Sequence, residues 1–327
     1  MRCSVILGGI VGLLFVVSVA CAADKLAVGV GSSENESAKI AGEEAAKKAR
    51  EALGSKHVRI VIVFSARRQL SQELVEGVAA VFDKKSIYGC EAYSPVTLDG
   101  NFASQGHDIK SGVAVMVIGG DIEVTAASEV VIKSDDRKKG FLECGKRIGE
   151  QLKAAVDVKV SGKIIVTFGN QHAGDNGPFV EGLTGILGNG IPIVGAAAGG
   201  DGAKEIVKGE IVVGANVAVV VTGDFKVGVG LAGGGGDLVA KAEESMSAAL
   251  KEAGGQPLIG MVFDCGGRRG ELVKQLKLVQ EYEMIRKLAG KTQIFGFYGG
   301  GEIGTPVVGA IPKGVGFSVA TAILSIE

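Results

Sequence analysis

Near-continuous runs of aliphatic and β-branched residues mark the buried strands of this chain. Three of them share one layout, at residues 58–64, 163–168 and 258–263, and each is followed by a polar turn and an amphipathic helical pattern. Strands this uniformly apolar are typical of sheets that are covered on both faces. The pattern predicts an α/β protein in which helices pack on mixed β-sheets.

The same three runs begin an internal repeat. In each copy a strand ends in phenylalanine, a helix follows, and a second short strand ends at a glycine, namely Gly89, Gly195 or Gly296. The repeat therefore predicts a strand-helix-strand pseudo-repeat in the fold. A glycine at this point either makes a sharp turn or lets a ligand or a neighbouring backbone come close, and turn geometry is the simpler reading.

Two charged helical patterns separate the copies. Residues 137–155 lie between the first and second copies, and residues 238–253 precede the third. The glycine run 233–236 is the best candidate for a domain boundary, because it has neither a hydrophobic pattern nor a charged residue. We expect one domain over residues 24–233 and a smaller one over residues 234–327.

The first 23 residues have a different character. Arg2 is the only charge before Asp24, and residues 5–19 are almost continuously apolar. Small residues at positions 20–22 supply the cleavage site that signal peptidase reads. The segment 1–23 therefore predicts a secretory signal peptide, export across the inner membrane and a periplasmic location.

Two alternatives to simple cleavage remain open. The apolar segment could be retained as a membrane anchor. Cys21 could instead be lipidated, although Ser18 stands where a bacterial lipoprotein box usually has leucine. Contact with the membrane is expected only through this segment or such a lipid anchor.

Composition excludes several classes of protein. Lys and Arg total 35 against 36 for Asp and Glu, and the chain has no Trp, so nothing favours a nucleic-acid partner. The mature chain keeps Cys90, Cys144 and Cys265, an odd number, so we expect one disulfide at most. Cys and His never cluster at ligand spacing, and we expect no metal and no cofactor.

A dinucleotide fingerprint also has to be weighed. Residues 228–233 satisfy G-x-G-x-x-G after a strand and before a helix. Further glycines and Asp237 intervene before the helix, however, and no acidic residue clearly ends a following strand. The motif is therefore interpreted as glycine-rich backbone rather than a cofactor site.

The last third of the chain carries the most specific motif. A strand ends in Asp264-Cys265-Gly266-Gly267-Arg268, an acidic helical pattern follows, and residues 296–303 read Gly-Phe-Tyr-Gly-Gly-Gly-Glu-Ile. This order resembles the C-terminal part of the FIST domain family. Residues 87–90 and 191–201 resemble, more loosely, two turn regions of the family's N-terminal part.

The resemblance implies a sensory domain that binds small molecules such as amino acids and is usually joined to an output module. This chain departs from that pattern by lacking an output module and by its signal peptide. We therefore expect a non-catalytic, extracytoplasmic module that binds a small molecule, such as an amino acid or a small carboxylate. Such a module would report to an envelope signalling partner. A purely structural or partner-binding protein is a further alternative.

The candidate ligand-binding residues lie in loops at strand ends. They are Cys90, His172, Asp201, Cys265, Arg268 and Glu302. Arg268 can present a planar fork to a ligand carboxylate, or to the carboxylate of Glu302 or Glu281 within the protein.

An enzymatic alternative rests on Cys265 and His172. A neighbouring cation favours the thiolate form, so Cys265 beside Arg268 could act as the nucleophile of a thiol-dependent hydrolase or transferase, with His172 as base. The simpler explanation of Cys265 is that it is a buried structural cysteine. The simpler explanation of His172 is that it is a solvent-exposed loop residue without a binding role.

Overall fold

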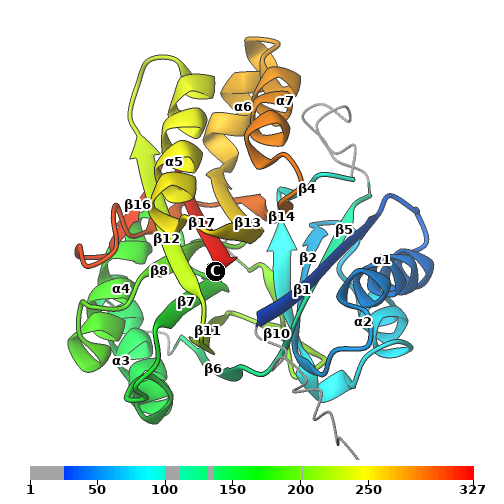
Figure 1. Cartoon of the computed structure of the whole chain (residues 1–327), viewed down its shortest axis with the longest axis horizontal. Helices are drawn as coiled ribbons and strands as arrows, with labels where there is room; N and C mark the ends of the chain where they lie inside the picture. The colour runs from blue at the N-terminus through cyan, green and yellow to red at the C-terminus, as the bar shows by residue number, and fades with distance from the viewer. Residues whose placement is uncertain (1–25, 100–110, 132–135, 201) are drawn as a thin grey trace, which may run out of the picture.

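Three similar units make up the part of the chain that the structure describes, which covers residues 26–99, 111–131, 136–200 and 202–327. In this computed structural model the described residues form seven α-helices and three mixed sheets, with the sheets toward the middle and the helices outside (Figure 1). The predicted α/β fold with a strand-helix-strand repeat is confirmed. The predicted signal peptide, residues 1–23, and the candidate Asp201 lie outside the described residues.

The units follow one another along the chain. The first contains β1 (Leu26–Ser33), α1 (Ala38–Leu53), β2 (Val58–Ala66), α2 (Gln72–Ala79), the 3-10 helix η1 (Lys84–Ser86), β3 (Ile87–Ala92), β4 (Ser94–Thr97) and β5 (Val113–Gly120). The second contains β6 (Glu123–Val130), α3 (Arg137–Val156), β7 (Gly162–Gly169), α4 (Ala173–Leu187), β8 (Ile193–Ala197), β9 (Lys204–Val207), β10 (Glu210–Val213) and β11 (Ala215–Gly223). The third contains β12 (Lys226–Gly233), α5 (Leu238–Ala253), β13 (Gln256–Cys265), α6 (Gly266–Lys274), α7 (Leu278–Ala289), β14 (Gln293–Gly299), β15 (Glu302–Gly304), β16 (Lys313–Val315) and β17 (Ser318–Ile326).

Each unit orders its strands in the same way. The sheets run β1-β5-β2-β3, β6-β11-β7-β8 and β12-β17-β13-β14, so the last strand of a unit lies between its first two. In each unit a helical crossover makes the second and third strands parallel, in the pairs β2/β3, β7/β8 and β13/β14. The carboxyl ends of these three parallel pairs are the places where an α/β sheet usually holds its ligand.

Every sheet is completed by a strand from another unit. The β9-β10 hairpin of the second unit extends the first sheet, and β15-β16 of the third unit extends the second. Strand β4 of the first unit extends the third sheet by pairing with β14. The three units are therefore interlocked in a cycle, and none of their sheets is complete within its own segment.

The repeated glycines let the parallel strands approach. Gly89, Gly195 and Gly296 each face the strand before them in the register, and a Cβ atom at any of the three would collide with a carbonyl oxygen of that strand. Of the alternatives left open by the sequence, close approach of a neighbouring backbone is the one observed here.

The strands are buried on both faces, which explains their uniform apolar sequences. Ile60, Ile62 and Phe64 of β2 point to a core shared by all three sheets, whereas Val61 and Val63 pack under the helices of the first unit. The alternation follows from the two-residue period of a strand.

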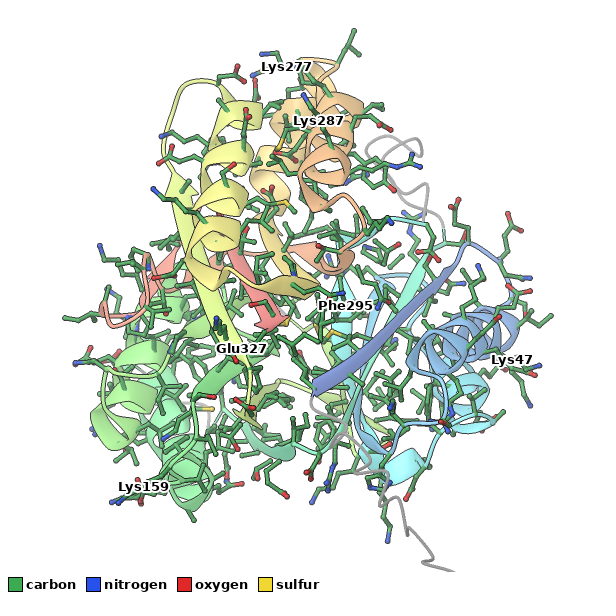
Figure 2. All side chains as sticks on the ribbon, viewed as in Figure 1. Lys47, Lys159, Lys277, Lys287, Phe295 and Glu327 are labelled. Carbon is green, nitrogen blue, oxygen red and sulfur yellow. The ribbon has the colours of Figure 1, made fainter. Side chains whose placement is uncertain are left out.

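Phenylalanines near the ends of the repeated strands meet in the middle of this shared core. The ring of Phe64 lies 5.5 Å from that of Phe168 and 6.1 Å from that of Phe263, both edge to face. Phe295 stacks on Phe64 at 4.6 Å. Figure 2 shows Phe295 near the middle of the molecule and the labelled Lys47 at its periphery.

The predicted boundary between residues 233 and 234 falls between β12 and α5. Both elements belong to the third unit, because β12 pairs with β17 and α5 packs on the same two strands. The division into domains 24–233 and 234–327 stays a prediction. Within the described residues, no helix is both long enough and apolar enough to cross a membrane.

Candidate functional site

A cavity of about 810 Å³ lies where the strand ends of the three units converge. Each unit contributes the residue four positions after its core phenylalanine, which places Arg68, His172 and Gly267 in the cavity wall. Tyr93 follows the third strand of the first unit, and Phe317 immediately precedes β17. We call this space the central cavity.

The wall of the central cavity is positively charged. Arg67, Arg68 and Arg269 line it together with His172, and none of the described lining residues is Asp or Glu. Arg67 and Arg68 are exposed, and within the described residues neither guanidinium has a hydrogen-bond or ion-pair partner. Arg269 is only 3% exposed and its guanidinium lies 5.7 Å from the centre of the Tyr298 ring.

Arg268 does not line the cavity, because its side chain is fully buried behind the wall. Its Nε donates to Asp264 Oδ1 at 2.7 Å and its Nη2 donates to Glu281 Oε1 at 2.8 Å. Tyr298 donates its hydroxyl to the second oxygen of Glu281 at 2.6 Å. The sequence left open a ligand, Glu302 or Glu281 as the partner, and the structure pairs Arg268 with Glu281 and Asp264.

This network places two carboxyl groups beside one cation. Burial and the charge of Asp264 raise the pKa of Glu281 to about 8, although Arg268 opposes both effects. Burial also raises the pKa of Asp264 against the attraction of Arg268. The Arg268 guanidinium is therefore occupied by the protein itself.

Cys265 lies at the cavity wall as the residue that precedes α6. Burial raises the pKa of its thiol, the nearby Glu302 carboxyl raises it further, and backbone N–H groups of Phe317, Gly267 and Arg268 lower it in part. The thiol therefore stays protonated at neutral pH, which is the opposite of an activated nucleophile.

Glu302 is fully buried behind Cys265. Its Oε2 accepts hydrogen bonds from the backbone N–H and the hydroxyl of Ser318, both at 2.9 Å. Burial, together with the charge of Asp264, raises its pKa to about 8.

Glu205 occupies the position in the first sheet that Glu302 occupies in the second. Glu205 of β9 faces Cys90 in the register, and Glu302 of β15 faces Ala196. Glu205 Oε2 accepts a hydrogen bond from the N–H of Ala215, the first residue of β11, at 2.9 Å. Glu302 does the same for the first residue of β17, so this contact is part of the repeated fold.

The structure brings together only part of the predicted set. His172 and Cys265 both line the central cavity, Arg268 and Glu302 lie buried behind it, and Cys90 is fully buried in the shared core. In the described residues Cys90, Cys144 and Cys265 are free thiols, and no cluster of three metal-ligating side chains occurs.

Sequence reasoning missed five wall residues, namely Arg67, Arg68, Tyr93, Arg269 and Phe317. A signal for one of them was present, because aligning the three copies on their phenylalanines puts Arg68 at the position of His172. No comparable signal marks Tyr93 or Phe317, because neither belongs to the repeated strand-helix-strand pattern.

Solved structures align with this chain at low sequence identity. Cyanuric acid hydrolase from A. caulinodans aligns with a TM-score of 0.50 and 11% identity, over 91% of this chain and 99% of that one. A second cyanuric acid hydrolase structure aligns with a TM-score of 0.47 and 8% identity, over 93% of this chain and 100% of that one. A chorismatase aligns with a TM-score of 0.45 and 8% identity, over 93% of this chain and 99% of that one. At such identities the likeness to the first structure is one of fold alone.

Family models match most of the described chain. The FIST N domain model matches residues 59–235 and the FIST C domain model matches residues 210–305. The two matches overlap from residue 210 to residue 235, where the second unit gives way to the third. No curated protein matches the sequence. Together, the fold and the two family matches show that this chain belongs to the FIST family of sensory domains.

Proposed function

We propose that this protein is a non-catalytic sensory module that binds a small organic anion, such as an amino acid or another small carboxylate, in the central cavity. The observation that carries the proposal is the charge of the wall. Arg67, Arg68 and Arg269 line one space with His172, and no lining carboxylate among the described residues neutralises them. Arg67 and Arg68, whose guanidinium groups have no hydrogen-bond or ion-pair partner among the described residues, are suited to bind a carboxylate in a planar, two-bond geometry.

The size of the cavity supports a small-molecule ligand. Ligand pockets typically measure about 300–1,000 Å³, and the central cavity measures about 810 Å³. The glycines of its wall, including Gly266 and Gly300, leave backbone groups accessible without side chains in between.

The thiol-enzyme alternative has one observation in its favour. Cys265 and His172, the proposed nucleophile and base, both line the central cavity. Against it stands the pKa of Cys265, which burial and Glu302 raise above its ordinary value. A nucleophilic cysteine needs the reverse shift, and we therefore favour binding over catalysis.

Binding of small carboxylates tests the proposal directly. We expect glutamate or succinate to raise the melting temperature of the purified protein, because a ligand that binds only the folded state stabilises it. The double variant Arg67→Gln/Arg68→Gln should bind at least about tenfold more weakly, since charge-assisted hydrogen bonds to charged groups contribute roughly 1.5–3 kcal/mol. Isothermal titration calorimetry measures both affinities.

Arg286→Gln is the matched control, because Arg286 lies on the exposed surface of α7 and, among the described residues, forms an ion pair with Glu283 alone. It should bind as the unaltered protein does. Absence of binding by any carboxylate, or equal affinity in the double variant, would contradict the proposal.

An extracytoplasmic location is part of the same proposal. It is supported by the apolar segment 5–19 with small residues at positions 20–22, and ligand occupancy would then be reported to an envelope protein. The mass of the protein purified from its own host tests the location: loss of the segment 1–23 is expected, and an intact N-terminus in the soluble fraction would refute it.

A further inference from the structure

Two aromatic side chains stand exposed in the wall of the central cavity. Tyr93 is 38% exposed and Phe317 is 39% exposed, and both line the cavity. Tyr93 belongs to the first unit and Phe317 to the third, so the two rings reach the same space from different sheets. Large aromatic side chains gain most of their stabilisation by burial, and two left open in one cavity indicate a missing partner.

The two rings lie over adjacent residues at the start of α6. A Cβ atom at Gly266 would meet the Tyr93 ring at its Cδ2 and Cε2 atoms, and one at Gly267 would lie 3.5 Å from Phe317 Cδ2. The absence of side chains at Gly266 and Gly267 therefore lets the two rings pack directly against the start of α6. The parts of the rings that stay exposed are left to contact a ligand in the cavity.

Phe317 holds its position at a conformational cost. Its φ is 57°, in the left-handed region that a bulky residue disfavours, and among the described non-glycine residues only Lys208 and Leu276 share this feature. The backbone N–H of Phe317 also acts on the Cys265 thiol, whose pKa it lowers in part. A strained residue that is retained in a cavity wall points to a role in binding.

The aromatic surface and the cationic surface of the cavity adjoin one another. A Cβ atom built on Gly200 would lie 3.4 Å from the Tyr93 hydroxyl oxygen and 3.9 Å from Arg67 Nη1, so both groups border the same residue. Arg68 follows Arg67 in the same wall. A single small molecule can therefore touch a ring and a guanidinium at once.

We infer that the central cavity selects a planar aromatic carboxylate, with its ring against Tyr93 and Phe317 and its carboxylate on Arg67 and Arg68. The inference rests on the proposed anion-binding function and narrows its ligand class. Stacked aromatic pairs are stabilised beyond the area they bury. An aromatic acid should therefore bind about tenfold more tightly than a saturated acid of the same size.

Calorimetric titration with three probes tests this selectivity. Benzoate has the ring and the charge, cyclohexanecarboxylate has the charge and a puckered ring, and benzyl alcohol has the ring without the charge. We expect benzoate to bind about tenfold more tightly than cyclohexanecarboxylate, and benzyl alcohol to bind more weakly than either.

The variant Phe317→Asn isolates the contribution of the ring. Asparagine tolerates a positive φ better than phenylalanine, so the fold should be kept while the ring is lost. The preference for benzoate should shrink to threefold or less, and the affinity for cyclohexanecarboxylate should not change. Leu276→Asn is the matched control, because Leu276 also has a positive φ, of 56°, is 90% exposed and does not line the cavity.

The possible results separate this inference from the proposal beneath it. Equal affinities for benzoate and cyclohexanecarboxylate would overturn the aromatic selectivity and leave the anion site standing. Failure of both acids to bind would overturn the anion site and the inference together. The same loss of preference in Leu276→Asn as in Phe317→Asn would also overturn the assignment of the ring.

Discussion

Arg268 and Arg269 are adjacent in α6, yet one is held inside the protein and the other lines the central cavity. Consecutive residues of an α-helix point about 100° apart, so neighbours face different surroundings. Arg268 faces Asp264, Glu281 and the Leu238 carbonyl, which accept hydrogen bonds from its Nε and Nη2 inside the third unit. Arg269 reaches the cavity over the Tyr298 ring.

Arg268→Ala should lower the free energy of unfolding by about 3–5 kcal/mol, because it leaves two buried carboxyl groups without their cation. Unfolding in urea measures the change. Arg286→Ala on the exposed face of α7 should cost within about 0.5 kcal/mol. A similar small loss in Arg268→Ala would show that the buried ion pairs are not needed for stability.

At the scale of elements, the parallel pairs β2/β3, β7/β8 and β13/β14 depend on glycine. In the third unit Gly296 faces Val262, and a Cβ atom would overlap the Val262 carbonyl oxygen. The obstacle is backbone inside a sheet rather than a mobile side chain, so relief requires the strands to separate. Gly89 and Gly195 have the same geometry in the other two units.

Gly296→Ala should therefore destabilise the protein by at least about 1–3 kcal/mol, the usual cost of forcing extra volume into a packed interior. The midpoint of thermal or urea unfolding reports the loss. Gly235→Ala is the control, because a Cβ atom there meets nothing within 4 Å and the residue has no positive φ. If the two variants were equally stable, the close approach of the strands would have no energetic consequence.

At the scale of the whole molecule, three glutamates are buried at separate places. Glu205 lies in the first sheet and Glu302 in the second, while Glu281 lies on α7 of the third unit. Burial raises the pKa of each from 4.5 to about 8. Between these values the folded protein keeps a proton that the unfolded chain has released, so stability falls as pH rises.

We expect the free energy of unfolding to decrease between about pH 5 and pH 8, by up to about 1.4 kcal/mol per pH unit for each such group. In Glu205→Gln this slope should be shallower by the contribution of one titrating group. The amide cannot titrate, but it still accepts the hydrogen bond from the N–H of Ala215. Urea unfolding at several pH values measures the slope, with the exposed Glu73→Gln as control. A slope unchanged in Glu205→Gln would show that this carboxyl ionises normally.

Local pattern in the sequence was enough for the elements and the repeat. Runs of apolar residues identified the strands because these strands are buried on both faces, and the recurrent phenylalanine and glycine marked the three copies. Cys265 and His172 both line the central cavity, because both follow equivalent strands of the repeat. All of these features depend on residues close together in the chain.

Long-range packing decided the rest. The exchange of β4, β9 and β15 among the units joins strands that hydrophobic pattern alone cannot pair. The sequence also could not distinguish Arg268 from Arg269. Its pattern does not show whether an arginine side chain pairs with a buried carboxyl group or lines a cavity. The sequence by itself determined which positions are buried and how the units repeat. Only the tertiary structure decided which side chains share the central cavity, since its wall is drawn from three units that are distant in the chain.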